Sequence, residues 1–187
     1  GSSEILIKIS TYLEKSENGP LFLGFLVFPS LLIFALCSAG LQEYNFTGLL
    51  GIPAYHTWIL LSAACMLAWC LRFLWIIASK ELLPASSKKQ IVILLALFAI
   101  CTIGALFTPY IEGSFSAALH LLFAYGAFLF FNAVYLNILR THAGYRSCYF
   151  GMIFFVCLLC FTASQISGLA ELVYACMVSV QLTMLSL

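Results

Sequence analysis

Most of this 187-residue chain consists of apolar stretches long enough to cross a lipid bilayer. A membrane-spanning helix needs ~20 consecutive, mostly apolar residues. Six segments meet that requirement: Leu21–Leu41, His56–Ser79, Gln90–Tyr110, Ser114–Leu139, Tyr149–Ser167 and Leu169–Leu187. The sequence therefore predicts an all-α fold, a polytopic bundle of six transmembrane helices.

The composition excludes a water-soluble domain and several kinds of site. Of all residues, 64% are hydrophobic and 8% are charged, whereas a soluble domain is ~25% charged. The net charge of +1 gives no indication of nucleic-acid binding. The chain has no Asp, which argues against carboxylate clusters for Mg²⁺ or Ca²⁺. Its eight cysteines lie in or beside apolar runs, where Cys packs as a small hydrophobe, so we expect no disulfide framework, metal or cofactor.

The first 19 residues differ from the remainder. Gly1-Ser2-Ser3 resembles a tag scar or a processed start. From Glu4 to Lys15, apolar residues recur at helical spacing among charged ones, which predicts a short amphipathic helix in the membrane interface. Residues 20–187 form the predicted six-span domain.

The positions of the basic residues predict the orientation in the membrane. Cytoplasmic loops of membrane proteins are enriched in Lys and Arg. All of the Lys and Arg residues fall on one side of the predicted spans: Lys8, Lys15, Arg72, Lys80, Lys88, Lys89, Arg140 and Arg146. Both termini and the loops 80–89 and 140–148 are thus predicted to be cytoplasmic. We expect an integral membrane protein of the plasma membrane or endomembranes if eukaryotic, or of the inner membrane if bacterial.

The predicted outward side carries three acids and two histidines: Glu43, Glu112, Glu171, His56 and His120. Of these, His120 is the most unusual. It lies ~9 Å into the fourth span at 1.5 Å per residue, and an ionisable group at that depth normally faces the bundle interior with a partner. One interpretation is an outward-opening polar pocket in which His120, Glu171, Glu112 and His56 bind a ligand. The alternative is structural, with neutral His120 bonded to Glu171 or to a carbonyl of a broken helix. A zinc site needs three closely spaced ligands, and the sequence offers no such pattern.

Other polar and small residues suggest specific local roles. Asn45-Phe46-Thr47 has the form of a glycosylation sequon on the outward side. Four polar residues in apolar spans are expected to form interhelical hydrogen bonds: Asn132, Asn137, Gln165 and Gln181. Small residues would allow close approach of a neighbouring helix: Ala124, Gly126, Ala127, Ser164 and Gly168.

Several short motifs resemble those of the Frag/DRAM/Sfk family of membrane proteins. They are Tyr44-x-x-Thr47-Gly48 followed by Pro53, Gly104-x-x-Phe107, His120-x-x-x-Ala124-x-x-x-Phe128, Tyr135, Tyr145-Arg146 and Gly168-Leu169-Ala170-Glu171. A Trp often follows the last Glu in that family, whereas Leu172 follows it here. The resemblance implies six spans and a role in lipid remodelling, membrane-lipid organisation or autophagy regulation, and it places His120 and Glu171 at family positions. A bacterial six-span family of unknown function shares much of the pattern.

Three functions are compatible with this sequence. The leading hypothesis is a protein that binds or organises membrane lipids through the polar pocket. The second is a membrane-embedded acyltransferase or lipid hydrolase in which His120 acts as general base and Glu171 orients it. The third is a small-solute carrier or a transporter subunit with a membrane-protein partner. Membrane lipids are the expected partners, and nucleic acid is not.

Overall fold

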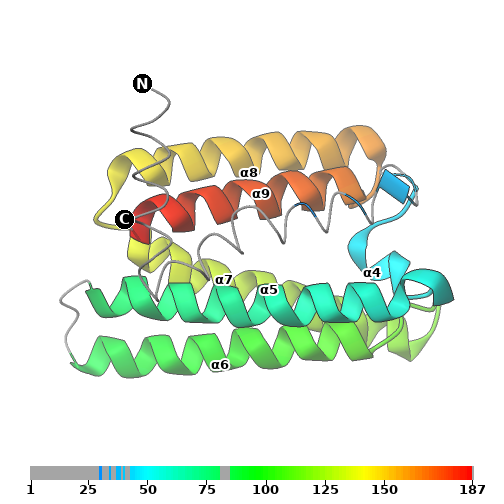
Figure 1. The fold of residues 1–187 in the computed structure, drawn as a ribbon, viewed down its shortest axis with the longest axis horizontal. Helices are drawn as coiled ribbons and strands as arrows, with labels where there is room; N and C mark the ends of the chain where they lie inside the picture. Colours follow the sequence, from blue (N-terminus) through cyan, green and yellow to red (C-terminus); the bar gives the residue numbers. More distant parts are fainter. Residues whose placement is uncertain are drawn as a thin grey trace, which may run out of the picture.

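The computed structural model describes residues 43–80 and 85–186, together with the single residues Ser30, Phe34, Cys37, Ser38 and Gly40. Helices dominate the two continuous ranges, in which no strand occurs (Figure 1). They are α4 (Phe46–Leu49), α5 (Pro53–Lys80), α6 (Ala85–Phe107), α7 (Phe115–Leu139), α8 (Ala143–Ala163) and α9 (Gly168–Ser186). Successive long helices run in opposite directions along the bundle.

Five of these helices are long and apolar enough to cross a membrane: Pro53–Lys80, Ser87–Phe107, Phe115–Leu139, Ala143–Ala163 and Gly168–Ser186. They confirm the last five predicted spans, and the chain is an integral, multi-pass membrane protein. The predicted interfacial helix Glu4–Lys15 and all but a few single residues of the predicted span Leu21–Leu41 lie outside the described residues.

The predicted boundaries of the fifth span are wrong by several residues. The sequence predicts Tyr149–Ser167, but α8 begins at Ala143 and ends at Ala163. A span predicted from hydropathy alone omits the polar first turn of α8, because a helix can continue beyond the hydrocarbon core into the membrane interface. At the other end Ser164 adopts a left-handed conformation with φ of 54°, a common way to end a helix.

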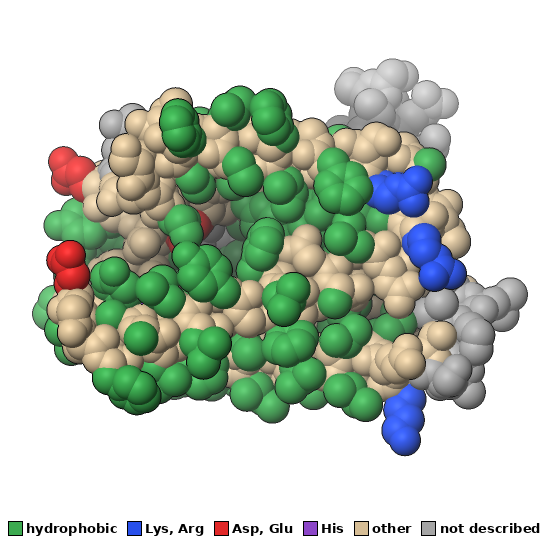
Figure 2. All heavy atoms as spheres, turned by 180° about the vertical axis from the view of Figure 1, so that it is seen from behind, with side chains coloured by type: hydrophobic (Ala, Val, Ile, Leu, Met, Phe, Trp, Pro, Cys, Tyr) green, Lys and Arg blue, Asp and Glu red, His purple; other side chains and the backbone are tan. Residues whose placement is uncertain are grey.

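Charged side chains gather at two opposite ends of the bundle (Figure 2). The described acids are Glu43, Glu112 and Glu171, which lie beside α4, in the α6–α7 turn and in the first turn of α9. These three places share one end of the molecule in Figure 1, hereafter the acidic end. The described basic residues, Arg72, Lys80, Lys88, Lys89, Arg140 and Arg146, lie toward the other end, hereafter the basic end. Between the two ends the surface carries large apolar side chains such as Phe154 and Phe161.

The larger of two buried clusters lies in the half of the bundle nearer the basic end. One buried cluster joins α5, α6, α7, α8 and α9 there: Trp69, Phe73, Leu74, Ile77, Ala78, Ile91, Leu95, Phe131, Val134, Tyr135, Ile138, Leu139, Tyr149, Val178 and Leu182. A smaller cluster around Leu49 and Ile59 holds α4 against α5 and α9 at the acidic end. The middle of the bundle between the two clusters is less completely filled.

Hydrogen bonds between side chains connect α7, α8 and α9. The hydroxyl of Tyr135 donates to Oε1 of Gln181, and Nε2 of Gln181 donates to the Tyr145 carbonyl at 3.2 Å. The hydroxyl of Tyr149 donates to Oδ1 of Asn132 at 2.5 Å. The interhelical bonds predicted for Asn132 and Gln181 are thus confirmed. Such bonds add specificity where lipid cannot supply partners.

Candidate functional site

His120 is buried on α7 and bonds to the end of α6. Its Nδ1 lies 3.0 Å from the carbonyl oxygen of Ala105 and 2.8 Å from that of Thr108. In a continuing helix the Ala105 carbonyl would accept a bond from residue 109, but that residue is Pro109, which has no N–H. The helix ends at Phe107, so the Thr108 carbonyl is also left without a helical donor. His120 therefore supplies the donor that Pro109 lacks.

This geometry fixes the proton on His120. Both partners of Nδ1 are carbonyl oxygens, which only accept hydrogen bonds, so Nδ1 carries the hydrogen. The ring of Tyr110 packs edge-on against the imidazole at a centroid distance of 5.9 Å. Of the alternatives predicted for His120, the bond to carbonyls of a broken helix is the one present. Its role is to hold α6 and α7 together at the acidic end.

Replacing His120 by Phe tests this role, because Phe retains an aromatic ring beside Tyr110 but cannot donate. The two carbonyls would lose their donor, and we expect the free energy of unfolding to fall by about 1 kcal/mol. His56 provides the control: it is exposed and its Nδ1 lies 2.9 Å from the Leu50 carbonyl. Thermal denaturation in detergent micelles should show a clear loss for His120→Phe and a change within about 0.5 kcal/mol for His56→Phe. Equal losses would contradict the assigned role.

Glu171 joins the start of α9 to the start of α4. Its Oε2 accepts a hydrogen bond from the backbone N–H of Phe46, the first residue of α4, at 2.5 Å. The Gly168 N–H donates to the Tyr44 carbonyl at 3.1 Å beside it. A carboxylate is well placed at the N-termini of two helices, where N–H groups are unpaired. Glu171 thus fixes α4 over the acidic end of the bundle.

Asn45 is the N-cap of α4. Its Oδ1 accepts from the Gly48 N–H at 2.7 Å and from the Thr47 hydroxyl at 3.3 Å. This arrangement stabilises a single-turn helix that would not form alone. Both polar residues of the predicted sequon are therefore engaged in forming α4.

The four residues predicted to form a polar pocket do not bond to one another in the described chain. His120 bonds to α6, Glu171 to α4 and His56 to Leu50, while Glu112 is exposed in the α6–α7 turn. Three of these four side chains have backbone groups as their hydrogen-bond partners. Within the described ranges there is also no group of three His, Cys, Asp or Glu side chains that could hold a metal ion.

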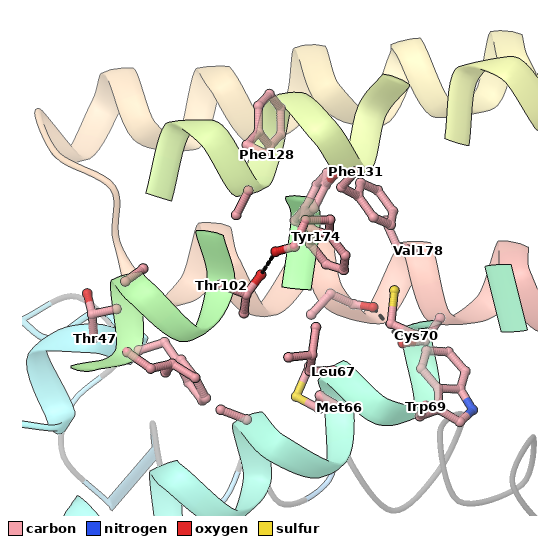
Figure 3. A pocket seen from close by; sticks show the side chains of 18 residues that line it. Thr47, Met66, Leu67, Trp69, Cys70, Thr102, Phe128, Phe131, Tyr174 and Val178 are labelled. Atoms are coloured by element: carbon pink, nitrogen blue, oxygen red, sulfur yellow. Dashed lines mark hydrogen bonds between the residues drawn. The ribbon is translucent and has the colours of Figure 1, made fainter. Parts of the chain in front are cut away.

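Close to these residues lies an apolar cavity of about 360 Å³ (Figure 3). It extends from α4 at the acidic end to the middle of the bundle. Its walls come from α4, α5, α6, α7 and α9: Phe46, Thr47, Ala63, Met66, Leu67, Trp69, Cys70, Phe98, Thr102, Ala105, Leu106, Ala127, Phe128, Phe131, Tyr174, Ala175, Val178 and Ser179. Small side chains on four helices, such as Ala63, Ala127 and Ala175, leave this space open.

The hydroxyl groups of the lining already have partners. The hydroxyls of Thr102 and Ser179 donate to backbone carbonyls in their own helices, each at 2.8 Å. The Trp69 indole N–H has no partner among the described residues, but Figure 3 shows it on the side of the ring away from the other labelled side chains. No charged side chain is among the residues that line the cavity. An empty space of this kind favours an apolar occupant over water.

The cavity is the feature that sequence inspection missed. Its only sequence signal is the small residues on the middle turns of several spans, and small residues equally indicate close helix packing. Comparisons of the chain with models of protein families, with curated proteins and with solved structures find no match. The chemistry of the cavity itself therefore carries the functional interpretation.

Proposed function

We propose that this protein binds the hydrocarbon chain of a membrane lipid in the cavity between α4, α5, α6, α7 and α9. The observation that carries the proposal is a volume of about 360 Å³ with an apolar lining inside a membrane-spanning bundle. This volume lies within the range of ~300–1,000 Å³ usual for small-molecule sites. Lipid chains are the most abundant apolar molecules around such a protein.

The dimensions of the cavity suit one leaflet of the bilayer. Along α6 the lining runs from Phe98 to Leu106, which is ~12 Å at 1.5 Å per residue. Half of the ~30 Å hydrocarbon core is ~15 Å. With the basic end cytoplasmic, as the positive-inside rule favours, the cavity faces the outward leaflet. Figure 2 shows a hollow on the side of the bundle, nearer the acidic end, through which a chain could enter from the lipid.

The resemblance to the Frag/DRAM/Sfk family supports the same class of function, because it implies a role in membrane-lipid organisation. The two alternatives have less support. The hydrogen bonds of His120 and Glu171 go to backbone groups, so they do not form the dyad that an enzyme of the proposed kind needs. A polar solute would find no charged group in the lining of the cavity.

Filling the cavity tests the proposal. Phe in place of Ala127 would occupy the space from α7, and Phe in place of Ala63 would occupy it from α5. Ala133, which is exposed on α7, gives the matched control Ala133→Phe. The measurement is mass spectrometry of lipids retained by each purified protein from native membranes.

We expect the wild type and Ala133→Phe to retain a defined lipid at a constant ratio to protein, and both filled variants to lose most of it. The filled variants should not melt at a lower temperature, because the new ring occupies empty space. Retention that is the same in all four proteins would refute lipid binding in this cavity.

A further inference from the structure

We infer that the lipid held in this cavity carries an amine-bearing head group, with the amine at the carboxylate of Glu171. The inference rests on the proposed function and specifies its ligand. It follows from the position of one carboxylate relative to the cavity and from the distribution of charge around it.

Glu171 is not itself a lining residue, but it lies one turn of α9 before two residues that line the cavity. Side chains three and four residues apart on a helix are neighbours, and Tyr174 and Ala175 both line the cavity. The carboxylate is bonded to the N–H of Phe46, which lines the same cavity from α4. The side chain of Glu171 is therefore at the acidic end of the cavity, between α4 and α9, where a head group would lie when its chain is inside.

The two oxygens of this carboxylate differ in their contacts with the described residues. Oε2 accepts the bond from Phe46, whereas Oε1 has no partner among the described residues. Glu171 is only partly buried, unlike Glu43 and Glu112, which are exposed. A half-buried carboxylate with one oxygen unbonded among the described residues is a good acceptor for an ammonium group, since charge-assisted hydrogen bonds are the stronger ones.

The surrounding charge disfavours an anionic head group. The described Lys and Arg residues lie toward the basic end, whereas Glu43, Glu112 and Glu171 lie at the acidic end. An acidic side chain is visible inside the hollow in Figure 2. A phosphate without a compensating amine would meet only like charge there, and juxtaposed like charges oppose binding. A zwitterionic lipid such as phosphatidylethanolamine satisfies both the apolar cavity and the carboxylate.

The experiment compares two lipids with identical acyl chains, phosphatidylethanolamine and phosphatidylglycerol, supplied in equal amounts in nanodiscs with the full chain. Retained lipid is then measured after extraction into detergent. We expect the wild type to retain phosphatidylethanolamine about fivefold over phosphatidylglycerol, a ratio worth about 1 kcal/mol. Equal retention of the two lipids by the wild type would overturn the inference without any variant.

Glu171→Gln then assigns the preference to this carboxylate. Gln can still accept the Phe46 N–H through its amide oxygen, so the change removes the charge while α4 keeps its bond. We expect the variant to retain both lipids equally. Glu112→Gln makes the same charge change at an exposed position of the same end and should keep the wild-type ratio. An unchanged ratio in Glu171→Gln would also overturn the inference.

The proposed function and this inference fail in different ways. If Ala127→Phe leaves the total amount of retained lipid unchanged, the cavity does not bind the chain. If that variant loses lipid while the ratio of the two head groups never departs from one, the cavity binds a chain but Glu171 does not select its head group.

Discussion

Replacing Leu49 by Ala is expected to lower the free energy of unfolding by about 2–5 kcal/mol. Leu49 is fully buried, with an exposed fraction of 0%, although α4 has a single turn. It packs with Ile59 of α5, and the partly buried Leu172 and Ala175 of α9 lie against them. Removing its side chain would leave a void at the junction of three helices, because the long helices cannot move to fill it.

Leu122 gives the matched control, since it is the same residue type on α7 with an exposed fraction of 67%. Thermal denaturation in detergent micelles should separate the two variants clearly, with Leu122→Ala close to the wild type. A similar stability for both would mean that α4 is not fixed to the bundle through Leu49. Because α4 also forms one wall of the cavity, Leu49→Ala should reduce lipid retention together with stability.

The spans were predictable from the sequence because a bilayer imposes a simple requirement on length and polarity. Five of the predicted spans correspond to α5, α6, α7, α8 and α9. The errors occur at helix ends, where that requirement does not apply. The polar first turn of α8 falls within the predicted loop 140–148. In the other case, α6 ends at Phe107 rather than at Tyr110 because Pro109 follows.

The site was less predictable, for a physical reason. His120 and Glu171 stand out in an apolar sequence, so their burial and need for partners could be expected. Their partners are backbone groups, the carbonyls of Ala105 and Thr108 and the N–H of Phe46. Every residue carries such groups, and no side-chain pattern marks which of them will be left unpaired. Pairing the His with the Glu was the natural inference from side chains alone.

The cavity depends on a quantity that the sequence does not display, the volume left between helices once they pack. The larger buried cluster lies in the basic half, where large residues such as Phe73, Phe131 and Tyr149 meet. Toward the acidic end Ala63, Ala127 and Ala175 face a common space. Whether small residues bring helices together or leave a gap depends on their register. Gly104 and Gly126, on neighbouring helices, illustrate the first outcome.

Gly104 of α6 packs directly against a side chain of α7. A Cβ atom placed there would lie 2.7 Å from Cγ of Phe123 and 2.8 Å from each Cδ of the same ring. At Gly126 on α7, the corresponding atom would lie 3.0 Å from Sγ of Cys101. The close approach predicted for Gly126 is confirmed, and the tighter contact is at Gly104. Because Cγ of Phe123 is bonded directly to Cβ, rotation of the ring cannot move this atom away from an added methyl group.

Gly104→Ala is therefore expected to destabilise the protein by about 1–3 kcal/mol, the usual cost of overpacking. Helix propensity alone predicts the opposite, because Ala is favoured over Gly by about 1 kcal/mol in a helix interior. Gly151 provides the control: it lies within α8, and a Cβ there would meet nothing within 4 Å. Gly151→Ala should leave the melting temperature unchanged or raise it.

The double variant Gly104→Ala, Phe123→Ala identifies the cause. Ala has no Cγ or Cδ atoms at the position of the clash, so the added methyl group should cost less beside it than beside Phe. The two substitutions should consequently be non-additive, with the double variant more stable than the sum of the single changes predicts. Additive losses would show that the methyl group at Gly104 acts through some contact other than Phe123. The coupling free energy between the two substitutions would thus measure how closely α6 and α7 pack near the end of α6, where His120 bonds to the Ala105 and Thr108 carbonyls.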